Sequence, residues 1–181
     1  MSAATHRYPR YKRVTSAVVL LITALWAAYL LLWPNTSKAA GTGIANGVKA
    51  PEFELKTLDG KMVKLSDYKG KAVMINFWAS WCGPCRAEMP TLQAVYKEFE
   101  AEGFVILAVN LNEPDLAVKS FQEKYGLTFP ILMDKGDRVS KLYDIVPLPT
   151  SYFVDKNGVV QGKWTGEIKK EQLRTFVKKL L

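Results

Sequence analysis

The stretch "NFWASWCGPCRAEMP", residues 76–90, contains both cysteines of this 181-residue chain, Cys82 and Cys85. The residues that lead into it, 71–78, form a nearly continuous apolar run, which is typical of a central strand buried on both faces. The cysteines therefore follow the carboxyl end of a buried strand, where open α/β sheets place their functional sites. Two cysteines at this spacing could form a structural crosslink, part of a zinc site, a haem attachment point or a redox pair.

The first three of these alternatives fit the sequence poorly. A crosslink over so short a loop removes little entropy from the unfolded chain, about 2 kcal/mol in the chain-entropy description. Structural zinc takes about four Cys or His ligands, whereas this chain has two cysteines and one histidine, His6. Covalent haem attachment needs a histidine directly after the second cysteine, and the residue there is Arg86. The sequence therefore favours a redox pair that works without metal or cofactor.

A helix is predicted to begin at Cys82. Apolar side chains follow it at three- and four-residue steps, namely Met89, Leu92, Val95, Tyr96 and Phe99. The unpaired N–H groups and the dipole at a helix start stabilise an anion there, and Cys-x-x-Cys thiols in such places have pKa values lowered to between about 3.5 and 7.5. Cys85, one turn further in, should be less exposed and should keep its proton longer. We therefore expect Cys82 to attack a substrate disulfide and Cys85 to resolve the mixed disulfide.

Two neighbours of the cysteines are candidates for substrate contact. Pro84 stiffens the turn between the cysteines and removes one donor near Cys82. Trp81 is expected beside the site as a lid, whereas Trp78 is expected in the core. Plain core packing is the alternative interpretation for Trp81.

The rest of the chain after residue 51 alternates between strand and helix patterns. The pairs Asp59-Gly60 and Asn157-Gly158 each predict a β-hairpin. Further strands are predicted at 104–110, 129–133, 150–154 and 159–164, and further helices at 114–125, 138–143 and 169–181. This order predicts an α/β domain with a central mixed β-sheet flanked by helices.

The amino-terminal part has a different character. Residues 1–13 contain four cations and no acid, and residues 14–33 contain no charged side chain. A helix of about 20 residues spans roughly 30 Å, the thickness of a bilayer core, and the preceding cations predict a cytoplasmic amino terminus. We therefore expect a single transmembrane helix at 14–33. A cleaved signal peptide is the alternative, with small residues at 36–40 as a cleavage site, although its apolar core is usually shorter.

The predicted organisation therefore has four parts: a basic cytoplasmic segment at 1–13, the membrane anchor at 14–33, a flexible linker at 34–50 and a folded domain at 51–181. The domain should lie outside the cytoplasm. Half of the formal net charge of +8 is in the first segment. The remaining cations are spread out rather than clustered, which argues against nucleic-acid binding.

The motif "FWASWCGPC" at 77–85 resembles the active-site signature of the thioredoxin family, and "LPT" at 148–150 is similar to the cis-proline loop of that family. Residues 51–181 resemble most closely the membrane-anchored, extracytoplasmic thiol–disulfide oxidoreductases of the ResA type. The resemblance implies a thioredoxin-like fold with a cis bond between Leu148 and Pro149. It also implies that Pro149 packs against the cysteines and helps to seat the backbone of the substrate.

The resemblance also implies partners. ResA-type proteins are low-potential reductants of apocytochrome c disulfides before haem attachment, and a membrane protein of the CcdA type re-reduces them. We expect a monomer with this function. Gly-Pro between the cysteines replaces the Glu-Pro of the best-known ResA-type protein and is shared with reducing thioredoxins. Other exported clients, such as a cell-wall or sporulation enzyme or general disulfide repair, stay open. So do an oxidase or isomerase, a thiol peroxidase and a non-catalytic chaperone module.

A proton carrier for the thiols is also predicted. Thioredoxins proper have a buried Asp where this chain has Asn76, which cannot act as a base. Glu88 follows Cys85 by three residues and hence shares its helix face, and ResA-like proteins have a Glu at the matching position. We predict that Glu88 moves a proton to or from Cys85. An ordinary exposed helix acid is the alternative.

Overall fold

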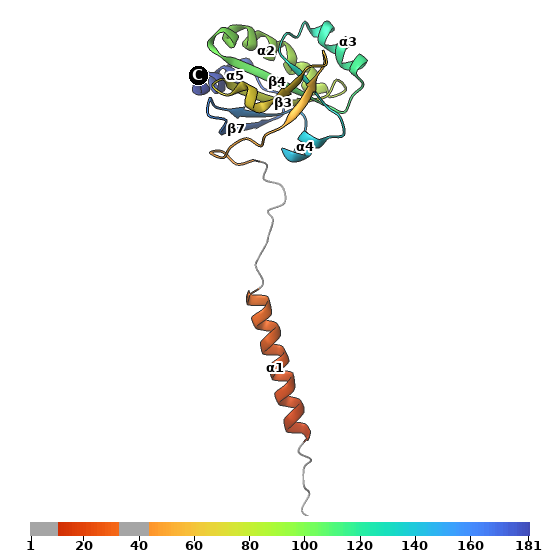
Figure 1. The fold of residues 1–181 in the computed structure, drawn as a ribbon, viewed down its shortest axis with the longest axis vertical. Coiled ribbons are helices and arrows are strands. Elements are labelled where there is room, and N and C mark those ends of the chain that lie inside the picture. The colour runs from red at the N-terminus through yellow and green to blue at the C-terminus, as the bar shows by residue number, and fades with distance from the viewer. Residues whose placement is uncertain (1–10, 33–43) are drawn as a thin grey trace, which may run out of the picture. The chain divides into compact units, whose positions relative to one another are not determined.

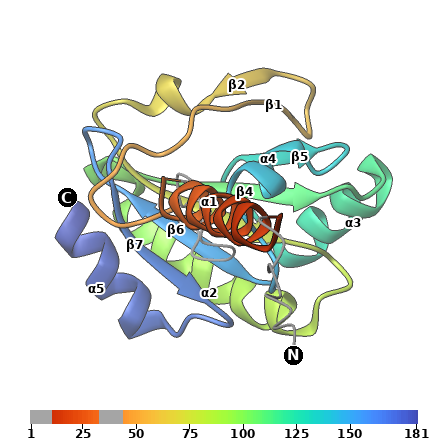
Figure 2. The same cartoon turned by 90° about the horizontal axis from the view of Figure 1, so that it is seen from below.

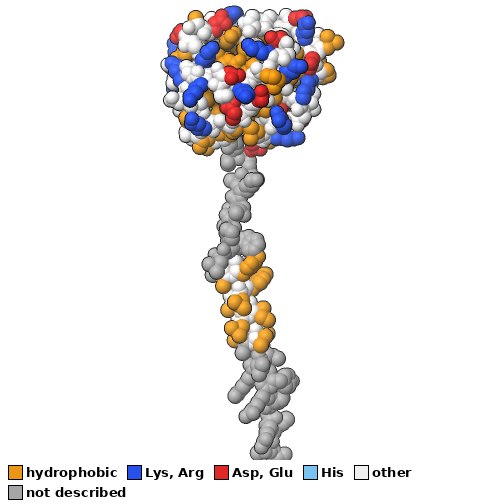
Figure 3. Space-filling view, viewed as in Figure 1, with side chains coloured by type: hydrophobic (Ala, Val, Ile, Leu, Met, Phe, Trp, Pro, Cys, Tyr) orange, Lys and Arg blue, Asp and Glu red, His pale blue; other side chains and the backbone are white. Residues whose placement is uncertain are grey.

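The computed structural model describes the backbone of residues 11–32 and 44–181, and the side chains of residues 18–29 and 44–181. Contacts divide the chain into two units, Met1–Ala40 and Gly41–Leu181. In the view of Figure 3, lysine and arginine side chains of the second unit are interspersed with aspartate and glutamate.

The first unit contains one helix, α1 (Tyr11–Leu32). The side chains of residues 18–29 within it are all exposed, and none of them is charged. None of the helices in the described part of the chain combines the length and the apolar character that a membrane crossing requires. The predicted span, 14–33, reaches beyond the residues whose side chains are described, and it stays a prediction.

The second unit, drawn as a ribbon in Figure 1, is built on a seven-stranded sheet with the order β2-β1-β5-β4-β3-β6-β7. Its strands are β1 (Glu54–Thr57), β2 (Met62–Lys64), β3 (Ala72–Trp78), β4 (Phe104–Leu111), β5 (Ile131–Asp134), β6 (Thr150–Val154) and β7 (Val160–Thr165). The three central strands β3, β4 and β5 are parallel, and the remaining neighbours pair antiparallel. The predicted mixed sheet is confirmed.

Four helices and two short 3-10 turns complete the second unit. They are α2 (Gly83–Phe99), α3 (Asp115–Tyr125), α4 (Arg138–Leu142), α5 (Lys170–Leu180), η1 (Leu65–Tyr68) and η2 (Glu100–Glu102). Helices α2 and α5 pack on one face of the sheet (Figure 2), and α4 packs on the other. The observed helices begin and end within one or two residues of the predicted bounds.

Strand β3 is the centre of the domain. Every side chain in it is buried. Met74 and Trp78 point to the face covered by α2, whereas Ile75 and Phe77 belong to the core on the opposite face. This burial on both faces explains the continuous apolar run in the sequence. It also fixes the position of the loop that follows β3, which carries the two cysteines.

The two predicted hairpins are present, β1 with β2 and β6 with β7. Their turns need glycine, because Gly60 and Gly158 have φ values of 92° and 78°, which L side chains rarely adopt. The second hairpin places β6 beside β3, so that Ser151 is the direct partner of Asn76 across the two strands.

Candidate active site

The two cysteines lie where β3 passes into α2. Cys82 is the N-cap residue of α2, with extended backbone, and its Sγ accepts a hydrogen bond of 3.2 Å from the backbone N–H of Cys85. Pro84 lies in the first turn of α2, where backbone N–H groups have no partner within the helix, so the N–H that proline lacks is not needed there. The two sulfurs are joined in a disulfide. The prediction that Cys82 stands at the start of the helix is confirmed.

The two sulfurs differ in access. Cys82 is 6% exposed and Cys85 is fully buried, so the predicted difference in exposure is confirmed. When the disulfide is reduced, the N–H groups at the helix start favour a thiolate at Cys82. Cys82 is therefore the sulfur that an incoming disulfide can reach. Cys85 can attack only the mixed disulfide that has formed on Cys82.

An apolar pocket adjoins Cys82. Its lining consists of Trp81, Cys82, Gly83, Pro84, Leu111, Val146 and Leu148. Trp81 is 67% exposed, whereas Trp78 is fully buried, so Trp81 lies beside the site and the core interpretation for it is wrong. Leu111, at the end of β4, and Val146, in the loop between α4 and β6, were not predicted from the sequence.

The predicted cis peptide bond between Leu148 and Pro149 is present. Leu148, rather than Pro149, lines the pocket beside Cys82. Pro149 is buried, and its carbonyl accepts a hydrogen bond of 2.8 Å from the N–H of Gly166. The loop is thereby tied to the segment that leads into α5.

Glu88 lies one turn beyond Cys85 on α2 and is only 1% exposed. Its Oε1 accepts a hydrogen bond of 2.9 Å from Asn76 Nδ2, and its Oε2 accepts one of 3.1 Å from the N–H of Ile168. Burial, with a smaller contribution from the nearby Glu167, raises the pKa of Glu88 to about 7, although the hydrogen bonds from Ile168 and Asn76 lower it. The alternative of an ordinary exposed helix acid is therefore wrong. The carboxyl group can take up or release a proton near neutral pH.

A second hydrogen-bonded cluster, which was not predicted from the sequence, holds the loop before Cys82. Glu113 is buried and accepts hydrogen bonds from Ser80 N at 2.7 Å, from Ser80 Oγ and from Asn110 Nδ2 at 2.6 Å. On the other side of the loop, Arg86 Nη1 donates to the carbonyls of Ser80 and Trp81, both at 3.2 Å. The only sequence signal was the position of Glu113 just after a buried strand parallel to β3.

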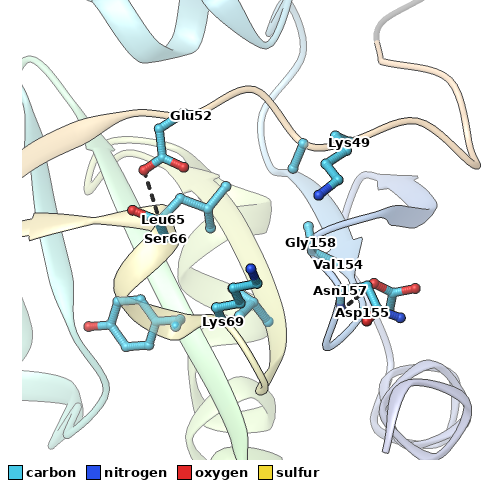
Figure 4. Close-up of a pocket in the computed structure, with 12 residues that line it drawn as sticks. Lys49, Glu52, Leu65, Ser66, Lys69, Val154, Asp155, Asn157 and Gly158 are labelled. Atoms are coloured by element: carbon cyan, nitrogen blue, oxygen red, sulfur yellow. Dashed lines mark hydrogen bonds between the residues drawn. The ribbon is translucent and has the colours of Figure 1, made fainter.

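Other parts of the domain do not offer a competing redox site. The pocket in Figure 4 lies at the opposite end of β3 and is lined by residues that include Lys49, Glu52, Lys69 and Asp155. None of the predicted site residues lines it. Across residues 18–29 and 44–181, no group of three or more His, Cys, Asp or Glu side chains could hold a metal ion.

Comparison with known proteins agrees with this geometry. The AhpC/TSA family matches residues 46–163. The thiol-disulfide oxidoreductase ResA of Geobacillus thermodenitrificans is 40% identical over 173 residues, which cover 94% of this chain and 98% of that protein. ResA of Bacillus cereus is 40% identical over 163 residues, covering 90% and 93%.

A solved structure gives the same result for the fold. The crystal structure of a thiol:disulfide interchange protein of the thioredoxin family from Chlorobium tepidum has a TM-score of 0.69 and 32% identity, and the match covers 76% of this chain and 98% of that one. The fold is therefore thioredoxin-like. Because the similarity to ResA extends over nearly the whole length of both chains, the protein belongs to the ResA family of thiol-disulfide oxidoreductases.

Proposed function

We propose that this protein reduces disulfides in other proteins, with Cys82 as the attacking thiol, Cys85 as the resolving thiol and Glu88 as the proton carrier. The observation that carries the proposal is the arrangement along α2. The reachable sulfur is at the head of the helix, the buried sulfur is one turn in, and a buried carboxyl group is one turn further.

The reaction proceeds in two exchange steps. In the dithiol form, the Cys82 thiolate attacks one sulfur of the substrate disulfide, and the other substrate sulfur leaves and takes up a proton. Cys85 then passes its proton to Glu88, and the Cys85 thiolate attacks the Cys82 sulfur. The bond between Cys82 and the substrate breaks, the second substrate sulfur leaves as a thiolate and takes up a proton, and the protein keeps the disulfide. Two electrons have moved to the substrate.

The pocket beside Cys82 is the proposed contact for the substrate. Trp81, Pro84 and Leu148 line it, and Pro149 fixes the loop from which Leu148 projects. An exposed aromatic side chain next to the reactive sulfur offers apolar contact area to a polypeptide without a fixed sequence requirement. This suits an enzyme whose substrate is another protein.

We propose the apocytochrome c disulfide at the haem site as the leading substrate, and a membrane protein of the CcdA type as the electron donor. The similarity to ResA supports both proposals. A reductant in an oxidising compartment needs a continual supply of electrons.

We also propose that the protein is a monomer anchored in the cell membrane by residues 14–33, with its amino terminus in the cytoplasm and the domain outside. The uncharged run and the preceding cations support this topology.

Trapping tests the proposal. The Cys85→Ala variant should hold the substrate as a mixed disulfide on Cys82, and mass spectrometry identifies the captured protein. The matched Cys82→Ala variant should capture nothing. Absence of c-type cytochromes among the captured proteins would contradict the proposed client. Equal capture by both variants would contradict the assignment of the attacking thiol. Faster oxidation by peroxide than by protein disulfides would favour a thiol peroxidase instead.

A further inference from the structure

We propose that Asn76, held in place by Ser151, is a positioning residue that fixes the Glu88 carboxyl group and sets how strongly it holds its proton. The inference goes beyond the proposed function but rests on the role proposed there for Glu88. It concerns a residue that cannot itself donate or take a proton in the reaction. Its effect is exerted through Glu88.

Three elements meet at this point. Asn76 is on β3, Glu88 on α2 and Ser151 on β6, and all three side chains are buried. The amide nitrogen of Asn76 donates to Glu88 Oε1 at 2.9 Å and to Ser151 Oγ at 3.0 Å. Both of its hydrogens are thereby used. Because Ser151 faces Asn76 across the paired strands, the serine fixes the plane in which the amide points at the carboxyl group.

The surroundings of Glu88 make this hydrogen bond important. In the part of the chain with described side chains, its carboxyl oxygens accept from two neutral donors, Asn76 Nδ2 and the N–H of Ile168, and from no cation. The acidic groups near it are the thiols that Cys85 and Cys82 carry after reduction and the carboxylate of Glu167. That carboxylate is paired with Lys169 at 2.5 Å. β3 and β6 contribute only the neutral Asn76 and Ser151.

The acceptor end of the same amide is left without a partner. Asn76 Oδ1 is buried and accepts no hydrogen bond from the described residues. Most buried polar atoms are paired, because an unpaired one costs free energy. The neighbours of Asn76 on the same face of β3, Met74 and Trp78, are apolar core residues. A polar side chain with one unpaired end in such a core indicates that its donor end is required.

The test replaces Asn76 with leucine, which is similar in size and donates nothing. The control is Met74→Leu, an equally buried position on the same face of β3. The full chain in its dithiol form is titrated by carbon-13 NMR of side-chain carboxyl groups, and the Glu88→Gln spectrum identifies the Glu88 signal. The rate at which Cys85 resolves a mixed disulfide on Cys82 is measured over the same pH range.

Loss of a hydrogen bond to the ionised form should raise the titration midpoint of Glu88 by about one to two pH units. The pH profile of resolution should move by the same amount, and Met74→Leu should move neither. Ser151→Ala leaves the amide in place but less fixed. We expect a smaller rise in the same direction, and this variant serves if Asn76→Leu does not fold.

The outcomes separate this inference from the proposed function. A Glu88 midpoint that is unchanged in Asn76→Leu, or in Ser151→Ala if only that variant folds, overturns the inference. A midpoint that moves while the resolution profile stays fixed supports the positioning role of Asn76 and contradicts proton transfer by Glu88. If Asn76→Leu still moves the resolution profile in a Glu88→Gln background, Asn76 acts by another route and the inference is wrong.

Discussion

Replacing Glu113 with alanine should destabilise the loop that carries Cys82. The carboxylate accepts three hydrogen bonds, two from Ser80 and one from Asn110. Hydrogen bonds to a charged group contribute about 1.5–3 kcal/mol each. Water can replace the two bonds to the half-buried Ser80, whereas the fully buried Asn110 keeps an unpaired donor. We therefore expect the free energy of unfolding to fall by about 3 kcal/mol, well below the sum of the three bonds.

Urea unfolding of the disulfide form, followed by tryptophan fluorescence, measures this loss. Glu113→Gln keeps one carbonyl acceptor and should lose about half as much. The control is Glu123→Ala, an exposed acid on α3, for which a change within about 0.5 kcal/mol is expected. In the reduced form, Glu113→Ala should also slow attack by Cys82 on a protein disulfide, because the loop no longer holds the sulfur in one position.

The reasoning would be refuted by a loss in Glu113→Ala below about 1 kcal/mol, or by one no larger than in Glu123→Ala. Either result would mean that Ser80 and Asn110 find equivalent partners without the carboxylate. The loop would then be fixed by its other hydrogen bonds, among them those from Arg86 to the carbonyls of Ser80 and Trp81.

Two further predictions follow from burial and packing. The pKa of Glu88 is raised from 4.5 to about 7, so between these pH values the native state keeps a proton that the unfolded chain releases. The contribution of Glu88 to stability is therefore full below pH 4.5 and falls by about 3 kcal/mol as pH rises through 7. Urea unfolding at about pH 5 and about pH 8 should show most of this fall in the parent chain and not in Glu88→Gln. A Cβ at Gly162 would lie 2.8 Å from Cε1 of Phe176, whose ring stacks on Phe153 at 4.1 Å. Gly162→Ala should therefore cost about 1–3 kcal/mol, seen as a lower Tm, and an unchanged Tm would mean that the Phe176 ring moves aside freely.

Features encoded by neighbouring residues were predictable. The buried strand β3, the helix start at Cys82 and the two glycine turns each depend on a short run of sequence, and the structure confirms them. Burial of Glu88 was less certain, because the position three residues after Cys85 is compatible with either a buried or an exposed side chain. Only the packing of α2 against β3 and α5 decides it.

The hydrogen bonds that complete the site could not be predicted in this way. Asn76 and Ser151 are 75 residues apart, and Ser80 and Glu113 are 33 apart. Such pairs follow from the register of β3 with β6 and with β4, which hydrophobic periodicity does not fix. A polar residue at 76, within an otherwise apolar strand, was the one available signal, and it showed only that some partner was needed.

The residue at 76 also determines how many buried carboxyl groups titrate near the disulfide. With aspartate there, as in the thioredoxins that the motif resembles, two carboxyl groups would lie within hydrogen-bond distance and share protons, and their titration would split into two steps that belong to the pair. Asparagine keeps the hydrogen bond at 2.9 Å and leaves one carboxyl group, Glu88, to respond to pH. Both the fall in stability through pH 7 and the proposed proton transfer from Cys85 then depend on the same group. A change that makes Glu88 a better proton acceptor must therefore alter the pH dependence of folding as well as that of the reaction.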